Sequence, residues 1–383
     1  MNFDALIGFV REQYRTDEFI PLHAPIFSGN EKRYVEETID STFVSSVGTF
    51  VDRFEKEIAS YTGSPKAVAA VNGTAALHMA LKLVGVQPKD HVITQPLSFI
   101  ATCNAISYCG ASPVFIDVDR CTLGLSPVAL EQWLQENAVV ADDLVCRHRA
   151  DQRAVRACVP MHTFGHPADL DGLNEVCQRW HIPLIEDAAE SLGSFYKGRH
   201  TGTLGVVGTL SFNGNKIITT GGGGMILTNA ELGKRAKHLT TTAKIPHPYE
   251  FIHDEVGYNY RLPNLNAALG CAQLEQLEAF VQAKRALAKS YQELLAGSSL
   301  QFVAEPADCR SNYWLNAVIC ADRAQRDALL QATNEKGVMT RPIWELMSRL
   351  PLYQHCLHGE LPNAEWLADR VVNLPSSVTR SAH

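Results

Sequence analysis

Hydrophobic and polar positions follow two alternating patterns along residues 64–230. Short apolar runs of strand length are separated by longer stretches whose apolar residues recur at helical spacing, which predicts alternating strands and helices. The expected strands are 68–71, 91–95, 112–119, 158–164 and 182–187, and the expected helices are 74–85, 99–110, 127–137 and 169–180. This alternation favours an α/β domain of three αβα layers, in which helices cover both faces of a mostly parallel sheet.

The pattern changes beyond residue 262, where helical spacing dominates. Residues 265–297 contain no proline, which predicts one long helix leading into a smaller α+β region. The start of the chain predicts a further amphipathic helix with Leu6, Phe9 and Val10 on one side. We therefore expect three parts, an extension helix over 1–20, a large domain over 21–262 and a small C-terminal domain over 263–383.

The stretch 136–157 is rich in charge and lacks a clear period. We expect an irregular, solvated loop here. Its four arginines could instead contact an anion, and the sequence leaves this alternative open.

Composition narrows the class of protein. The 383 residues are 46% hydrophobic, and 34 basic against 41 acidic residues give a net charge of −7, which argues against nucleic-acid binding. No apolar run approaches the roughly 18 residues of a membrane span, and the first 20 residues lack the basic start of a secretory signal. The ten cysteines stand singly. We expect a reduced, cytoplasmic protein without a disulfide framework and without a bound metal.

Three strand-to-helix junctions carry candidate chemistry, because ligands of open α/β sheets bind beyond the carboxyl ends of the strands. At the first junction, residues 71–81 (VNGTAALHMAL) place Gly73 and Thr74 at the start of a helix. Gly73 would let a ligand approach the backbone, and the free N–H groups of the first turn suit a phosphate. An ordinary capped helix start would give the same tripeptide.

The second junction places Glu186 and Asp187 at the end of the apolar run 182–185. A partly buried carboxylate at this position needs a cationic partner. A protonated pyridine nitrogen and an arginine or lysine of the core are both candidates. Glu190 lies one helical turn further on and would face the same pocket.

The third junction carries Ser211, then Lys216, then the four glycines 221–224. Partial burial beside Ile217 and Ile218 would make the Lys216 amine a nucleophile for carbonyl carbons. A flexible loop with a solvated lysine is the alternative. No G-K-[ST] follows the glycines, so they are not a P-loop, and no strand–GxGxxG–helix is found, which disfavours a nicotinamide-dependent dehydrogenase.

Together, the three junctions supply what pyridoxal 5'-phosphate requires. The lysine can form the Schiff base, the strand-end aspartate can keep the pyridine nitrogen protonated, and the helix start can hold the phosphate. The combination is more specific than any one of the motifs.

At these residues the chain resembles the DegT/StrS group of sugar-nucleotide aminotransferases, which have the fold-type I architecture. The likeness extends from about Pro21 to Pro375, through the motifs VNGTAALHMAL, EDAAESLGS, SFNGNKIITTGGGGMI, GYNYRLPNLNAALG and LPSS. The motif SFNGNKIITTGGGGM together with MHTFGHPADLD is most similar to the branch that acts in legionaminic-acid and bacillosamine pathways.

The resemblance implies cofactor roles for individual residues. Lys216 would carry the cofactor, and Asp187 would pair with its ring nitrogen. The phosphate would be bound by Ser211 together with Gly73, Thr74 and Ala75. Phe99 would stack on the ring, or else serve as core packing. Asn259 would reach the phosphate of the neighbouring subunit, which implies a homodimer with shared active sites.

Four further residues become substrate candidates by the same resemblance. Arg341 and Trp344 would touch the nucleotide sugar. Arg261 would support the loop that carries Asn259 or the substrate, or else form a structural ion pair. His162 would line the pocket or be a core histidine with its hydrogen bonds satisfied.

The chain departs from the group at two positions. Gly222 replaces an acidic residue of many relatives, and Glu190 replaces a glutamine or histidine. Glu190 can donate a hydrogen bond to the cofactor only when it is protonated. Relatives that act as dehydratases carry histidine in place of the lysine, so Lys216 argues against that activity.

The resulting hypothesis is a transaminase with two half-reactions. L-Glutamate would convert the cofactor to pyridoxamine 5'-phosphate, which would aminate the 4-keto carbon of a nucleotide-linked 4-keto-6-deoxy sugar for glycan biosynthesis. UDP-2-acetamido-2,6-dideoxy-hexos-4-ulose is the expected acceptor. Two alternatives stay open, a non-catalytic sensor of the cofactor or of a sugar nucleotide, and a nicotinamide-dependent sugar dehydrogenase.

Overall fold

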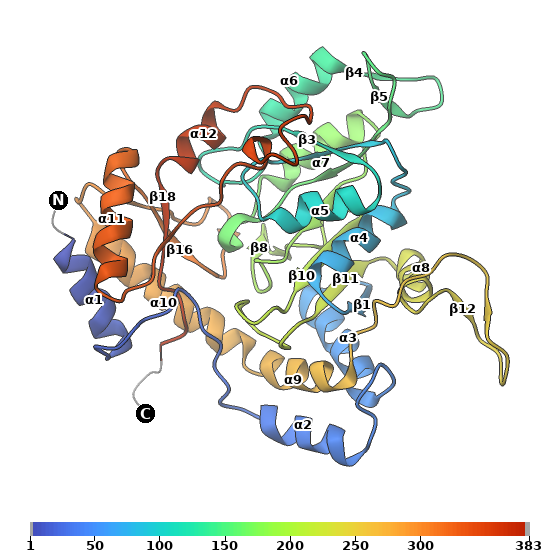
Figure 1. The fold of residues 1–383 in the computed structure, drawn as a ribbon, viewed down its shortest axis with the longest axis horizontal. Coiled ribbons are helices and arrows are strands. Elements are labelled where there is room, and N and C mark those ends of the chain that lie inside the picture. The colour runs from blue at the N-terminus through green and yellow to red at the C-terminus, as the bar shows by residue number, and fades with distance from the viewer. Residues whose placement is uncertain (1–2, 380–383) are drawn as a thin grey trace.

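A mixed, mostly parallel sheet forms the centre of the larger part of the molecule (Figure 1). The computed structural model describes residues 3–379, and the outer ends of the expected first and last parts, residues 1–2 and 380–383, lie outside it. Isolated parallel bridges from Cys158 to Leu184 and from Met161 to Asp187 join two groups of strands into one sheet. In spatial order the strands are β3 (Ser112–Phe115), β2 (His91–Thr94), β6 (Val155–Val159), β7 (Ile185–Asp187), β10 (Val207–Ser211), β11 (Gly224–Thr228) and β1 (Lys66–Ala70). Only β11 runs antiparallel to its neighbours.

Helices cover both faces of this sheet, which confirms the predicted α/β class. Side chains alternate between faces along each strand, so Val68 packs against one helical layer and Ala69 against the other. One layer holds α4 (Gly73–Leu83), α5 (Ile100–Tyr108) and α8 (Ala230–Thr240). The other holds α3 (Thr49–Thr62), α6 (Pro127–Asn137), α7 (Leu170–Arg179) and α9 (Asn264–Leu274). Local sequence starts several of these helices, because Asn72, Ser126 and Asp169 accept first-turn N–H groups as N-caps.

A second, antiparallel sheet forms the smaller part. Its spatial order is β14 (Gln301–Phe302), β16 (Asn316–Ile319), β18 (Val371–Leu374) and β17 (Arg341–Pro342). Around it lie α1 (Asp4–Tyr14), α10 (Leu277–Leu295), α11 (Arg323–Glu335) and α12 (Pro362–Ala368). The short helix η2 (Met347–Arg349) packs against the large part instead, where Met347 shares a cluster with Cys103 and Phe115. Leu6 and Val10 of α1 share a core cluster with Tyr291 of α10. No helix of the described chain is both long and apolar enough to cross a membrane.

Short elements connect the two parts and extend from them. They are α2 (Glu31–Asp40), β4 (Ala138–Val140), β5 (Cys146–His148), η1 (Thr163–Gly165), β8 (Phe195–Tyr196), β9 (Arg199–His200), β12 (Lys244–Ile245), β13 (Ile252–His253) and β15 (Cys309–Arg310). The hairpin β12–β13 projects away from the body of the molecule (Figure 1).

The long helix expected over 265–297 is in fact two helices, α9 and α10. The chain turns at Glu275 and Gln276, whose side chains bind elsewhere in the fold. Glu275 accepts hydrogen bonds from the hydroxyl of Tyr34 and from Arg53, at 2.6 and 2.9 Å. Gln276 donates to Glu31 at 2.7 Å. Helix α9 therefore packs on the large part, against α3, and α10 runs toward the small sheet.

The stretch 136–157 was expected to be irregular, but it contains the hairpin β4–β5. Asp151 fixes this hairpin to the sheet, because its two oxygens lie 2.9 Å from His91 Nε2 and 2.8 Å from His148 Nδ1. Arg147 pairs with Asp143 at 2.8 Å. This arginine therefore serves the hairpin itself.

Candidate active site

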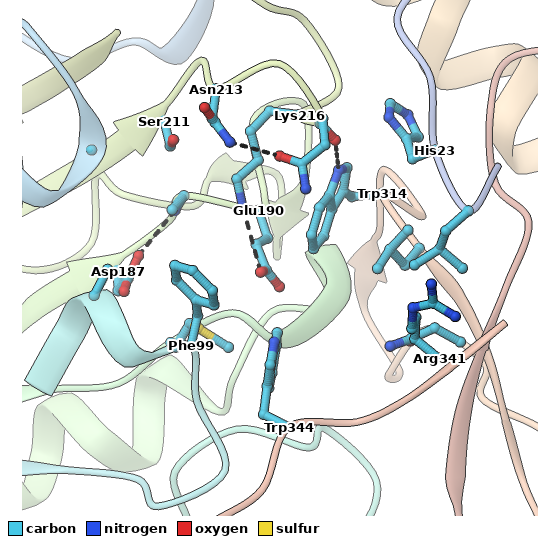
Figure 2. Close-up of a pocket in the computed structure, with 18 of the residues that line it drawn as sticks. His23, Phe99, Asp187, Glu190, Ser211, Asn213, Lys216, Trp314, Arg341 and Trp344 are labelled. Carbon is cyan, nitrogen blue, oxygen red and sulfur yellow. Dashed lines mark hydrogen bonds and ion pairs between the residues drawn. The ribbon is translucent and has the colours of Figure 1, made fainter. Parts of the chain in front are cut away.

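The carboxyl ends of β7 and β10 and the start of α4 open onto a cavity of about 940 Å³ (Figure 2). Segments of the small part, including β17 and the loop after it, complete its wall. Nine of the predicted site residues line it: Gly73, Thr74, Phe99, Asp187, Glu190, Ser211, Lys216, Arg341 and Trp344. The fold thus brings residues from both parts of the chain to one site.

Lys216 reaches into this cavity from the loop after β10. Its Nζ lies 3.5 Å from Glu190 Oε1 and 4.1 Å from the ring centre of Trp314. The indole N–H of Trp314 also donates to the carbonyl of Asn215 at 2.7 Å, so one tryptophan contacts the lysine and the peptide before it. An amine held between a carboxyl group and an aromatic face is confined to a small region of the cavity.

Asp187, at the end of β7, presents a carboxylate that forms no ion pair with a cation of residues 3–379. Its side chain accepts from the hydroxyl of Thr102 at 2.7 Å and from the N–H of Ala189 at 3.2 Å. Burial raises the pKa of this carboxyl group above its ordinary value. A cationic ligand group placed beside it would offset that cost.

Glu190 is held inside the protein, beside Lys216. Its Oε2 accepts from the N–H of Phe164 at 2.9 Å. Burial raises the pKa of Glu190 from 4.5 to about 7, although nearby Lys216 acts in the opposite direction. Near neutral pH a large fraction of Glu190 is therefore protonated and able to donate a hydrogen bond.

This pKa makes stability depend on pH. Below pH 4.5 Glu190 is protonated in the folded and unfolded chains, whereas between pH 4.5 and 7 only the unfolded chain releases the proton. The free energy of unfolding consequently falls as the pH rises through that window. At about 1.4 kcal/mol per pH unit the loss is about 3 kcal/mol above pH 7. Glu190→Gln should recover it in the ligand-free protein, as measured by urea unfolding at pH 8 and at pH 4.5.

Glu186 provides a matched control for this prediction. It is equally buried, but it accepts from the backbone N–H groups of Gly202 and Gly205 at 2.7 and 2.6 Å and lies 3.0 Å from His162 Nε2. Although burial opposes ionisation, these partners lower the pKa of Glu186 overall. Glu186→Gln should therefore destabilise the protein at pH 8. Equal effects of the two substitutions would contradict the assignment of opposite pKa shifts.

Gly73, Thr74 and Ser211 form a cradle at the start of α4. The N–H groups of Gly73 and Thr74 precede the first intrahelical hydrogen bond and remain available to a ligand. A Cβ added to Gly73 would lie 3.0 Å from Ser211 Oγ, and one added to Gly224 would lie 2.4 Å from the carbonyl oxygen of Asn72. Glycine is therefore required where the helix start meets β10 and β11.

These groups fit pyridoxal phosphate. The cradle has hydrogen-bond donors for the phosphate, and the buried Asp187 lacks the cation that a protonated pyridine nitrogen would supply. Lys216 lines the same cavity and offers the amine that would form the Schiff base with the cofactor. Figure 2 shows the ring of Phe99 pointing into the cavity between Asp187 and Trp344. The side chain of Phe99 is 50% exposed, so it is not core packing.

Arg341 and Trp344 lie on the side of the cavity away from Asp187 and Ser211 (Figure 2). Arg341 Nη1 donates to Asn334 Oδ1 and to the carbonyl of Thr340, both at 3.0 Å. The Trp344 ring packs 5.2 Å from that of Phe164. The small part of the protein thus holds Arg341, whereas Trp344 packs on Phe164 of the large part.

Four predicted residues do not line the cavity. His162 is a fully buried core histidine, because its Nε2 is paired with Glu186 and its Nδ1 accepts from the N–H of Ala168 at 3.1 Å. The N–H of Ala75 is already bonded to the Asn72 cap at 2.7 Å. Asn259 and Arg261 lie on an exposed segment and bond to each other at 3.0 Å.

Several lining residues were not predicted from the sequence. They include His23, Asn213, Asn215, Trp314 and Asn373. None of them lies in a strand-to-helix junction with a recognisable motif, except the two asparagines beside the lysine in SFNGNK. Of these five residues, only Asn213 and Asn215 lie in a sequence motif that could have indicated them.

Comparison with known proteins agrees with this geometry. The model of the DegT/DnrJ/EryC1/StrS aminotransferase family matches residues 25–381. The GDP-perosamine synthase of Escherichia coli O157:H7 is 36% identical over 94% of this chain and 93% of its own length. That of Caulobacter vibrioides is 36% identical over 93% of each chain. The solved structure of the aminotransferase TlmJ from Streptoalloteichus hindustanus has a TM-score of 0.85 at 30% identity and covers 95% of both chains.

These similarities confirm the group that the motifs indicated, but not its legionaminic-acid and bacillosamine branch, because both of these relatives are perosamine synthases. The chain therefore belongs to the DegT/DnrJ/EryC1/StrS aminotransferase family, and it is a pyridoxal-phosphate-dependent sugar aminotransferase.

Proposed function

We propose that this enzyme transfers the amino group of L-glutamate to the 4-keto carbon of a nucleotide-linked 4-keto-6-deoxy sugar. The observation that carries the proposal is the single cavity that joins Lys216 and Asp187 to Arg341 and Trp344. The first pair suits the cofactor, and the second pair offers a cation and an aromatic face to a larger, anionic substrate. A sugar nucleotide would need both ends of the cavity.

Pyridoxal phosphate, when bound, supplies an electron sink for the carbon that gains or loses the amine. Lys216 Nζ takes a proton from the α-carbon of the donor and, in the second half-reaction, delivers one to C4 of the acceptor sugar. Asp187 keeps the ring nitrogen protonated. Glu190 can hold or release a proton at 3.5 Å from Lys216 Nζ. A positioned group of this kind contributes about 10²- to 10⁴-fold to the rate.

Two acceptors are to be compared. The motifs of the chain favour UDP-2-acetamido-2,6-dideoxy-hexos-4-ulose, whereas the names of the relatives favour a GDP-linked sugar. Incubation with glutamate and a panel of UDP-, GDP- and dTDP-linked 4-keto sugars, followed by mass spectrometry, tests the proposal. We expect one class of acceptor to be converted to the amine.

Failure of every acceptor would contradict the proposed function. The cofactor spectrum then separates the alternatives. A visible spectrum that glutamate does not change would favour a non-catalytic sensor. If glutamate alone changes the cofactor spectrum, the protein is still a transaminase, but these sugars are not its acceptors.

We also propose a homodimer in which Asn259 reaches the site of the second copy. Asn259 lies outside its own cavity, on the exposed segment that follows the β12–β13 hairpin (Figure 1). Tyr249, Phe251 and Val256 near this hairpin are at least 80% exposed, which is unusual for large hydrophobic side chains of a monomer. Sedimentation velocity should show a dimer, and Phe251→Asp should weaken it.

We place the enzyme in the cytoplasm, in the synthesis of a surface glycan. All ten cysteines are free, and most are buried, which suits a reducing compartment. Detection of the protein and of its amino-sugar product in a cytosolic fraction would test the location.

A further inference from the structure

Asn373, on β18, has a side-chain amide without a partner at the wall of the cavity. The residue lines the cavity and is only 4% exposed. Its Oδ1 is buried and accepts no hydrogen bond from residues 3–379. Its Nδ2 also has no acceptor among these residues, but it is not fully buried. Buried polar groups are nearly always paired, so this amide requires an explanation.

In the small sheet, Asn373 lies beside the cationic residue Arg341. Asn373 is opposite Arg341 in the antiparallel pairing of β17 with β18, and directly opposite residues share one face of a sheet. Both residues line the cavity. The small sheet thus presents a neutral donor–acceptor group and a positive charge side by side.

Resting on the proposed function, we propose that Asn373 determines specificity for the acceptor by hydrogen bonding to a neutral substituent of its sugar. Because its Nδ2, unlike its Oδ1, is not fully buried, the amide can donate to the oxygen of a hydroxyl or an N-acetyl group. Arg341 is the neighbouring group suited to the anionic part of the same substrate.

The amino donor is a weaker candidate for this contact. The polar groups of glutamate beyond its amine are carboxylates, which pair preferentially with arginine or lysine. Asn373 is also carried by the small sheet, whereas Asp187, Ser211 and Lys216 come from the large part. A donor bound at Lys216 and Glu190 would not require a second sheet for recognition.

Asn373→Leu tests the assignment because leucine has the same branching without polar atoms. Since the amide has no protein partner, the unfolding midpoint should be unchanged or higher. The glutamate-driven change of the cofactor spectrum should stay within about twofold of wild type. In contrast, kcat/KM for the keto sugar should fall about 10- to 100-fold, the effect of losing one or two hydrogen bonds.

Asn174→Leu on α7, outside the cavity, makes the same chemical change and should alter neither half-reaction.

Acceptors that carry a hydroxyl or an acetamido group at the same position identify the group that is recognised. A larger fall for one acceptor assigns the contact to that substituent, and equal falls assign it to a polar group that both share. A lower unfolding midpoint, an equal loss in both half-reactions, or unchanged acceptor kinetics would each overturn the proposal. Absence of acceptor conversion by the wild-type enzyme would instead refute the proposed function itself.

Discussion

Lys216→Ala is expected to reduce transamination by about 10⁴-fold or more, because it removes the amine that attaches the cofactor and moves the proton. The described cavity wall contains no second lysine that could replace it. Steady-state turnover with glutamate and the keto sugar measures the effect. Lys216→Arg keeps a cation beside Glu190 and Trp314, yet it should be equally inactive because a guanidinium stays protonated.

Lys197→Ala serves as the control for this substitution. Lys197 is an exposed lysine paired with Asp171 at 2.6 Å and lies outside the cavity, so its loss should leave turnover unchanged. Substantial turnover of the Lys216→Ala enzyme, or an equal loss in both variants, would count against the assigned role.

Asp187→Asn is expected to lower the rate by about 10²-fold or more while leaving the shape of the site intact. Asparagine can still accept the hydrogen bond from Thr102, but it no longer holds a positive charge on the ring nitrogen. Rapid-mixing measurement of the glutamate half-reaction reports this effect directly. The expected loss is smaller than that for Lys216 because the attachment point and the proton carrier remain.

Stability separates this electrostatic role from a structural one. Because burial raises the pKa of Asp187, the charged form destabilises the folded, cofactor-free chain above the ordinary pKa of the group. The cofactor-free Asp187→Asn variant should therefore be at least as stable as wild type at pH 8. A variant that loses both rate and stability would show that the carboxylate is structural.

The sequence predicts those features that arise locally. Residues 127–137 form the expected helix because Ser126 caps it and a proline occupies its first turn. Asp187 and Ser211 lie at the carboxyl ends of β7 and β10, and Lys216 lies in the loop that follows β10. Because the carboxyl ends of neighbouring parallel strands meet at one edge of the sheet, their convergence follows from the pattern.

Features that depend on distant contacts escape such reasoning. The break after α9 arises because Glu275 and Gln276 bind α2 and α3, which lie more than 200 positions earlier in the chain. Trp314 and Asn373 come from the small part, where no motif links them to Lys216. His162 was assigned to the pocket or to the core, and the structure places it in the core. Its partner Glu186 directly precedes Asp187 in β7. Because adjacent residues of a strand face opposite sides of the sheet, Glu186 and His162 lie on the side away from Asp187.

Every role assigned to the site requires that the ε-amine of Lys216 carries the cofactor. Borohydride reduction of the purified, cofactor-containing enzyme, followed by proteolysis and mass mapping, tests it most directly. The peptide that contains Lys216 should gain the mass of the reduced pyridoxyl phosphate. An unmodified Lys216 peptide, or the label on another lysine, would contradict it.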